Sequence, residues 1–186
     1  MKGLEEIYKD LETRMSKSIN AFQSEMARIR TGRATPALLE GIKVEYYGSQ
    51  VPLQQIAGIM VPEPRLLVVQ PWDKNVIGEI EKAIRKTGLG LNPINDGNVI
   101  RIPIPPLSDE RRQDLIKLVK KLAEDARVAV RNIRRDGVEK VKVMEKNKEV
   151  SEDERIKAEN KIQKITDKFI EEINSLLEKK EKEILE

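Results

Sequence analysis

The sequence predicts an α+β protein in which a small β/α/β sandwich domain is inserted between the first and second helices of a long three-helix bundle. Apolar residues recur at a helical period over residues 1–30 and again over residues 107–186. Across residues 31–106 that period is lost, and proline and glycine become frequent. We therefore expect a discontinuous bundle domain and an inserted β/α domain, with hinge strands at 31–33 and 104–107 joining them.

The first predicted helix occupies residues 1–30. Its apolar side chains lie within about 60° of one line along the helix; they are Leu4, Ile7, Leu11, Met15, Phe22, Met26 and Ile29. Thr31-Gly32 should end this helix, because glycine readily adopts the positive φ of a helix terminus. Pro36 then prevents the helix from resuming.

The inserted domain is predicted to contain short strands and one helix. The strand candidates are apolar or β-branched runs bounded by turn residues, at 42–47, 56–61, 66–70, 90–94 and 99–104. The helix candidate, residues 73–86, has Asp73 as its cap and Gly88 as its stop. We expect Trp72 in the core or at the rim of this domain rather than as a platform for stacked bases.

Two more long helices follow. Ser108 is the predicted cap of a helix that runs to about Asn147, and the Ser151–Glu154 capping box begins the last helix. Helices with a single apolar stripe must bury it, so the three should form a bundle. Antiparallel packing of the first two helices would place Arg131 opposite roughly Ile7.

Composition excludes most enzyme classes. The chain has no cysteine and no histidine, which removes thiolate nucleophiles, histidine general bases and the usual zinc or copper ligands. We therefore expect no enzymatic activity, no metal and no cofactor. The N-terminus does not resemble a signal peptide, and no run of about 18 apolar residues is present. These features predict a soluble, cytoplasmic protein that does not associate with membranes.

The stretch RVAVRNIRR, residues 127–135, places four arginines and no acid within nine residues. Relative to Arg127 on a helix, Arg131 lies at about +40°, Arg134 at about −20° and Arg135 at about +80°. Such a stripe suits phosphate oxygens, because guanidinium groups are planar, multiply donating and permanently charged. The alternative is a solvated face whose charges pair with neighbouring acids. No acid lies within the run, since Glu124 and Asp136 flank it.

Charge is concentrated around this stripe. Residues 108–150 hold 13 lysines and arginines against 9 acids, whereas residues 34–107 hold seven of each. Arg28, Arg30 and Arg33 form a second group beside the first hinge strand. They could bind an anion, or, as we slightly favour, pair with Glu40 or Asp109.

Five stretches together are very specific: RIRTGRATPALLEGIKVEYYG at 28–48, TGLGLNP at 87–93, IRIPIPPLSDERR at 100–112, ARVAVRNIRRD at 126–136 and KEVSEDE at 148–154. On these residues the chain resembles bacterial ribosome recycling factors. The resemblance implies an L-shaped molecule with the dimensions of transfer RNA. It also implies a translation factor that binds the post-termination ribosome and, with elongation factor G and GTP, splits the subunits and releases mRNA and tRNA.

The resemblance also implies site residues. The family's ribosomal RNA contacts on the large subunit fall on Arg127, Arg131, Arg134 and Arg135, with Arg30 and Arg33 near the hinge. The hinge itself would involve Thr31, Gly32, Pro105 and Pro106. The alternative role of Gly32, Pro105 and Pro106 is to end the neighbouring helices. We expect a monomer in solution.

One rival function comes from another class of protein. A helical adaptor could bind an acidic protein partner through the Arg127–Arg135 face. Capture of a protein partner that is lost at high salt but is insensitive to RNase would indicate the adaptor. Co-sedimentation with ribosomes would indicate the translation factor.

Overall fold

The computed structural model describes residues 2–186, and these form two compact units. One unit comprises residues up to Arg30 together with Asp109–Glu186, and the other comprises Thr31–Ser108. The first is entirely helical apart from its connecting residues, and the second combines strands with a short helix. The predicted α+β class is confirmed.

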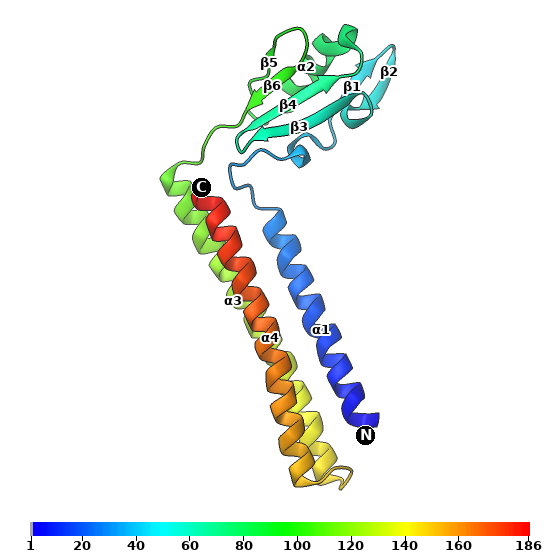
Figure 1. The fold of residues 1–186 in the computed structure, drawn as a ribbon, viewed down its shortest axis with the longest axis vertical. Helices are drawn as coiled ribbons and strands as arrows, with labels where there is room; N and C mark the ends of the chain where they lie inside the picture. The colour runs from blue at the N-terminus through cyan, green and yellow to red at the C-terminus, as the bar shows by residue number, and fades with distance from the viewer. Residues whose placement is uncertain (1) are drawn as a thin grey trace. The chain divides into compact units, whose positions relative to one another are not determined.

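The helical unit contains α1 (Lys2–Ala27), α3 (Asp109–Lys146) and α4 (Glu152–Leu185), which pack along one another (Figure 1). α1 ends earlier than the predicted residue 30. The N–H groups of Arg28 and Ile29 bond to carbonyls three residues back, so the chain tightens and leaves the helix. The apolar period persists to Ile29, which is half-buried without being helical.

The core of this unit runs along all three helices. Its members come from the predicted apolar stripes and are Leu4, Tyr8, Leu11, Met15, Ile19, Phe22, Met26, Ala123, Ala126, Val130, Ile133, Val141, Val150, Ala158, Ile162, Ile165, Phe169 and Ile173. Burial of these side chains is the main stabilising contribution to the unit, because apolar area removed from water contributes about 25 cal/mol per Å².

Local signals define the connection between α3 and α4. Lys148 adopts a positive φ of 60°, and the Glu149 N–H donates to the Met144 carbonyl at 2.8 Å, which closes the end of α3. The Ser151 side chain accepts a bond from the Glu154 N–H at 3.1 Å, and the Glu154 carboxylate accepts one from the Ser151 N–H at 3.2 Å. The predicted capping box is therefore confirmed.

A buried glycine allows α1 and α3 to approach closely. A Cβ built on Gly137 would lie 2.6 Å from Leu11 Cδ1 and 2.9 Å from Leu11 Cδ2. A Cβ on Gly3 would likewise lie 3.0 Å from Met144 Cε, near the other end of the interface. α1 and α3 are therefore antiparallel.

The predicted register of α1 and α3 is wrong. Arg14 bonds to Asp136, and Gly3 faces Met144, so Arg131 lies at a level of α1 well beyond Ile7 and toward its C-terminus. The prediction aligned the end of α1 with the start of α3. α3 has 38 residues and α1 has 26, and the excess length of α3 is at its N-terminal end.

The second unit contains two antiparallel sheets (Figure 1). A hairpin pairs β1 (Lys43–Tyr46) with β2 (Ser49–Pro52), and a four-stranded sheet has the order β3 (Ala57–Glu63), β4 (Leu66–Pro71), β6 (Ile100–Pro103) and β5 (Ile94–Asn95). α2 (Ile77–Arg85) follows a 3₁₀ turn whose first N–H groups are capped by Asp73, which accepts from the Asn75 N–H at 2.9 Å.

The prediction from the sequence omitted β2 and made β5 too long. The β1–β2 turn uses Tyr47 and Gly48, both with positive φ, at 47° and 87°. Two-residue turns of this kind usually carry Asn or Asp at the first position, so tyrosine hid the hairpin. β5 was predicted over 90–94, but Gly90 has a positive φ of 70° and Pro93 has no N–H to donate, which leaves only Ile94–Asn95 to pair.

Buried and less buried residues alternate along β4 and β6, so the two faces of the four-stranded sheet differ. Leu67, Val69, Ile100 and Ile102 are fully buried in the core of this unit. The residues that alternate with them are less buried: Val68 is half-buried and Arg101 is exposed, and Trp72 directly follows β4. Trp72 is 70% exposed, which excludes the core and leaves the rim, the other position expected for it.

Candidate nucleic-acid interface

The basic face of α3, defined by Arg127, Arg131, Arg134 and Arg135, lies beside the buried stripe of the same helix. Neighbouring Ala126, Val130 and Ile133 are buried, and on a helix they lie at about −60° to −120° from Arg127. α1 and α4 both pack against that buried side. The four arginines therefore share one face of one rigid helix, as the sequence predicted from spacing alone.

Two of the four arginines have acidic or amide partners. Glu124 Oε2 accepts a hydrogen bond from Arg127 Nη1 at 3.0 Å, and Glu124 Oε1 accepts one from Arg131 Nη1 at 3.2 Å. Arg127 Nε also donates to Asn174 Oδ1 of α4 at 2.9 Å. No acid lies within residues 127–135, but Glu124, three and seven residues before these two arginines, pairs with both, so the alternative of pairing with a neighbouring acid applies to them.

The other two arginines are available. Within residues 2–186, Arg134 and Arg135 make no side-chain hydrogen bond or ion pair, and Arg135 is exposed. A guanidinium without an internal partner keeps all five N–H donors for solvent or a ligand. The basic face is thus a combination of two oriented arginines and two free ones.

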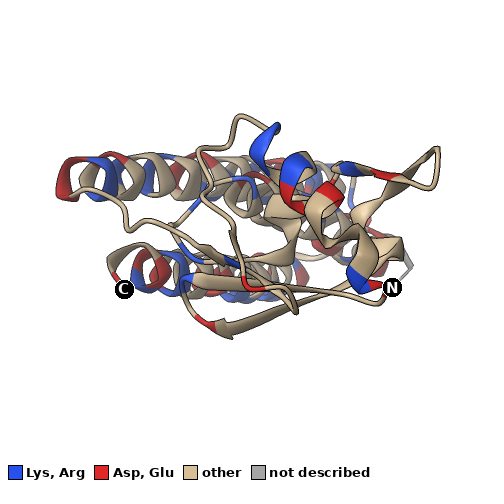
Figure 2. Ribbon diagram, turned by 90° about the horizontal axis from the view of Figure 1, so that it is seen from above, with Lys and Arg blue, Asp and Glu red and all other residues tan. Residues whose placement is uncertain are grey.

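Lysines on the same side of α3 extend this face in both directions, and the prediction from sequence omitted them. They lie within about 80° of Arg131 on the helix, are all exposed, and are Lys117, Lys120, Lys121, Lys142 and Lys146. Applying the same angular count beyond residues 127–135 would have found them. Basic and acidic residues are both spread along the long helices (Figure 2), so the angular position of a charge matters more than its number.

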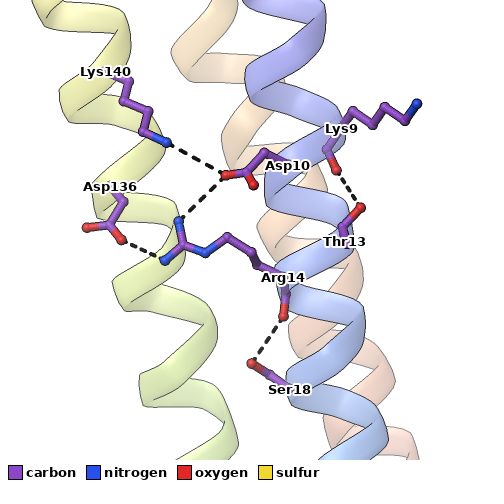
Figure 3. A network of polar contacts seen from close by, with 7 residues as sticks. All are labelled: Lys9, Asp10, Thr13, Arg14, Ser18, Asp136 and Lys140. Atoms are coloured by element: carbon purple, nitrogen blue, oxygen red, sulfur yellow. Dashed lines mark hydrogen bonds and ion pairs between the residues drawn. The ribbon is translucent and has the colours of Figure 1, made fainter.

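Asp136, the acid that follows the basic run, forms an ion pair with Arg14 of α1. Figure 3 shows Arg14 between two carboxylates, with Nη2 2.8 Å from Asp136 Oδ2 and Nη1 3.7 Å from Asp10 Oδ2. Lys140 Nζ lies 3.7 Å from the same Asp10 oxygen. The hydrogen bond to Asp136 raises the pKa of Arg14 above its ordinary value. Because Asp136 pairs across the helix interface, it does not neutralise the neighbouring Arg135.

Arg30 is exposed and lies beyond the end of α1, so it is not part of the basic face within the helical unit. Arg33 is half-buried in the other unit. Asp109, one of the acids expected to pair with this group, contacts Arg112 at 3.4 Å.

The predicted hinge residues occupy two adjacent connecting segments. Gly32 has a positive φ of 78°, and a Cβ there would lie 3.0 Å from Leu107 Cγ. Further in, the Ala34 N–H donates to the Pro64 carbonyl and the Ile104 N–H donates to the Arg65 carbonyl, each at 2.7 Å. Both segments are therefore anchored on the β3–β4 turn, and glycine is required where they meet.

A comparison with known families agrees with a role in translation. Residues 22–185 match the family model described as Ribosome recycling factor, which spans both units. The chain belongs to the ribosome recycling factor family. Its function is accordingly ribosome recycling.

Similar ribosome recycling factors match over nearly their whole length. That of Carboxydothermus hydrogenoformans is 55% identical over 182 residues, covering 98% of each chain. That of Halalkalibacterium halodurans is 56% identical over 181 residues, covering 97% of this chain and 98% of the relative.

Solved structures of the family are also similar. A solution structure of the ribosome recycling factor has a TM-score of 0.69 and 50% identity, covering 100% of this chain and 98% of that one. A model of the T. thermophilus ribosome recycling factor and the E. coli elongation factor G bound to the E. coli post-termination complex gives a TM-score of 0.63 at 53% identity, with 98% and 99% covered. Among the described residues of the present chain, no helix is long and apolar enough to cross a membrane.

Proposed function

We propose that this ribosome recycling factor binds ribosomal RNA of the large subunit through the basic face of α3. Together with elongation factor G and GTP hydrolysis on that factor, it separates the subunits of the post-termination ribosome and frees mRNA and tRNA. The helical unit anchors the molecule, and the β/α unit receives the force of the translocase.

The observation that carries the proposal is the availability of Arg134 and Arg135 beside the oriented Arg127 and Arg131. A face that served only to stabilise the bundle would have its charges paired with acids, as Arg14 has. Unpaired guanidinium groups on a rigid helix are suited to phosphate oxygens, since each makes charge-assisted hydrogen bonds in a planar fork.

The size of the effect follows from general values. A hydrogen bond to a charged group contributes about 1.5–3 kcal/mol when its loss leaves a partner unsatisfied, so removal of one contacting arginine should weaken binding at least tenfold. Each phosphate neutralised also adds about 0.7–0.9 to the slope of log affinity against log salt. Salt dependence therefore separates phosphate contact from a change of fold.

The test measures sedimentation of the protein with large ribosomal subunits across a salt series. Arg131→Ala and Arg135→Ala are each expected to reduce affinity. Each should also make the slope of log affinity against log salt shallower by about 0.7–0.9, the value for one phosphate contact. Lys9→Ala is the matched control, because Lys9 is exposed on α1 and its side chain points away from α3 (Figure 3). Wild-type affinity and salt slope in both arginine variants would refute the proposed interface.

We also propose that Thr31, Gly32, Pro105 and Pro106 form the hinge, with Arg30 and Arg33 as nearby RNA contacts. The backbone bonds of Ala34 and Ile104 support this location, because they leave the segments beyond them as the part able to bend. Gly32→Val should strain the positive φ and crowd Leu107. Subunit binding is expected to persist while splitting with elongation factor G and GTP slows. Normal splitting by this variant would show that the hinge lies elsewhere.

A further inference from the structure

Glu124 connects two arginines of the basic face with one carboxylate. Its Oε2 accepts from Arg127 at 3.0 Å, and its Oε1 accepts from Arg131 at 3.2 Å. Asn174, on the neighbouring α4, accepts from Arg127 Nε at 2.9 Å. The carboxylate and the amide thus hold guanidinium groups that are separated by one helical turn.

The bonds leave most donors unused. Arg127 employs Nε–H and one Nη1–H of its five donors, and Arg131 employs one Nη1–H. The Arg131 side chain is 42% exposed and that of Arg127 is 20% exposed, so the remaining donors of Arg131 in particular can reach a ligand. Hydrogen bonds from Arg127 and then Arg131 lower the pKa of Glu124, which keeps the carboxylate charged at neutral pH.

We propose that Glu124 is a positioning residue of the RNA-binding face, which orients Arg127 and Arg131 before the phosphate backbone arrives. This inference rests on the proposed function of that face. Long arginine side chains lose rotamer freedom on binding, and a side chain already oriented in the free protein loses less. Glu124 therefore raises affinity, although it carries the same sign of charge as phosphate.

Electrostatic repulsion between Glu124 and phosphate opposes this effect. The direction in which affinity changes when Glu124 is removed distinguishes positioning from repulsion. If Glu124 acted only as a negative charge near RNA, its removal would tighten binding, most strongly at low salt. If it positions the arginines, its removal weakens binding. Asp125 provides the matched control, because it is exposed, adjacent and about 100° further around the helix, and it makes no side-chain hydrogen bond or ion pair with any of residues 2–186.

The first experiment measures side-chain motion in the free protein. Nitrogen-15 relaxation gives order parameters for the arginine Nε–H groups. The order parameters of Arg127 and Arg131 should be lower in Glu124→Ala than in the wild type or in Asp125→Ala. Glu124→Gln should be intermediate, because its amide oxygen can accept from only one side of the former carboxylate. Unchanged order in Glu124→Ala would overturn the proposal whether or not the face binds RNA.

The second experiment measures affinity for large ribosomal subunits at moderate salt. Glu124→Ala should bind about two- to fivefold more weakly, the range expected for exposed ion pairs, while Asp125→Ala binds equally well or slightly more tightly. In an Arg131→Ala background the loss caused by Glu124→Ala should become smaller.

Equal or tighter binding by Glu124→Ala would overturn the positioning role. In that case a loss of affinity in Arg135→Ala would still support the proposed function, because Arg135 does not contact Glu124. Wild-type affinity in Arg131→Ala and Arg135→Ala would instead refute the function of the face itself.

Discussion

Gly137→Ala is predicted to destabilise the helical unit, although alanine is the better helix former. Gly137 is buried within α3, and the new methyl group would lie 2.6 Å and 2.9 Å from the two methyl carbons of Leu11. Ordinary carbon contacts are about 3.5–4.0 Å, so the overlap is about 1 Å. Leu11 is 1% exposed, and its side chain has no solvent-facing space into which to move.

Two opposing free energies determine the magnitude. Replacing glycine by alanine within a helix favours folding by about 0.8–1 kcal/mol. Overpacking a closed core opposes folding by about 1–3 kcal/mol. We expect a net loss of about 1 kcal/mol in the free energy of unfolding, or about 2–4 °C in melting temperature for a chain of this size.

The assay is denaturant and thermal unfolding followed by far-UV circular dichroism, with a double-mutant cycle. Leu11→Ala alone should cost about 2–5 kcal/mol. It also removes all three atoms that crowd position 137, so adding Gly137→Ala to this background should raise stability. Gly78→Ala is the control, because Gly78 lies in α2 and a methyl group added there would have nothing within 4 Å, so alanine should stabilise by about 0.5–1 kcal/mol.

A Gly137→Ala protein that gains stability, as Gly78→Ala is expected to do, would contradict this prediction. A loss of the same size in the wild-type and Leu11→Ala backgrounds would be equally damaging. Either outcome would mean that Gly137 does not determine the close approach of α1 and α3.

Two further perturbations test local features. Ser151→Ala should lower the free energy of unfolding by about 1 kcal/mol through loss of the cap of α4, measured by urea denaturation, and no loss would show that the capping bonds are replaced by water. In the β/α unit, backbone N–H groups of Val99 and Asn98, followed by Arg101, lower the pKa of Asp96 from 3.8 to about 2. Because the folded pKa is the lower one, the stabilisation is present above about pH 4 and is lost as the pH falls toward 2. Asp96→Asn should therefore be less stable than the wild type at neutral pH, and the two should converge near pH 2 in acid titrations of unfolding; a constant difference would contradict the assignment.

Features encoded by neighbouring residues were predicted well. These features depend on residues within a few turns of one another. They are the apolar stripes of α1, α3 and α4, the capping box at Ser151 and the angular grouping of the four arginines. Such signals act through backbone geometry that is the same in every helix. β2 is the local failure, because its turn begins with Tyr47, a residue that seldom adopts a positive φ.

Residues close together in the chain thus specify the fold class, the three helical faces and the positions of the arginines on one of them. Partners from other helices depended on the tertiary structure: Asp136 pairs with Arg14 of α1, and Asn174 of α4 accepts from Arg127. The tertiary structure also decided the register of α1 on α3, in which Gly137 meets Leu11. These contacts join residues far apart in the chain, and close packing of the side chains selects among registers that helical periodicity alone leaves equivalent.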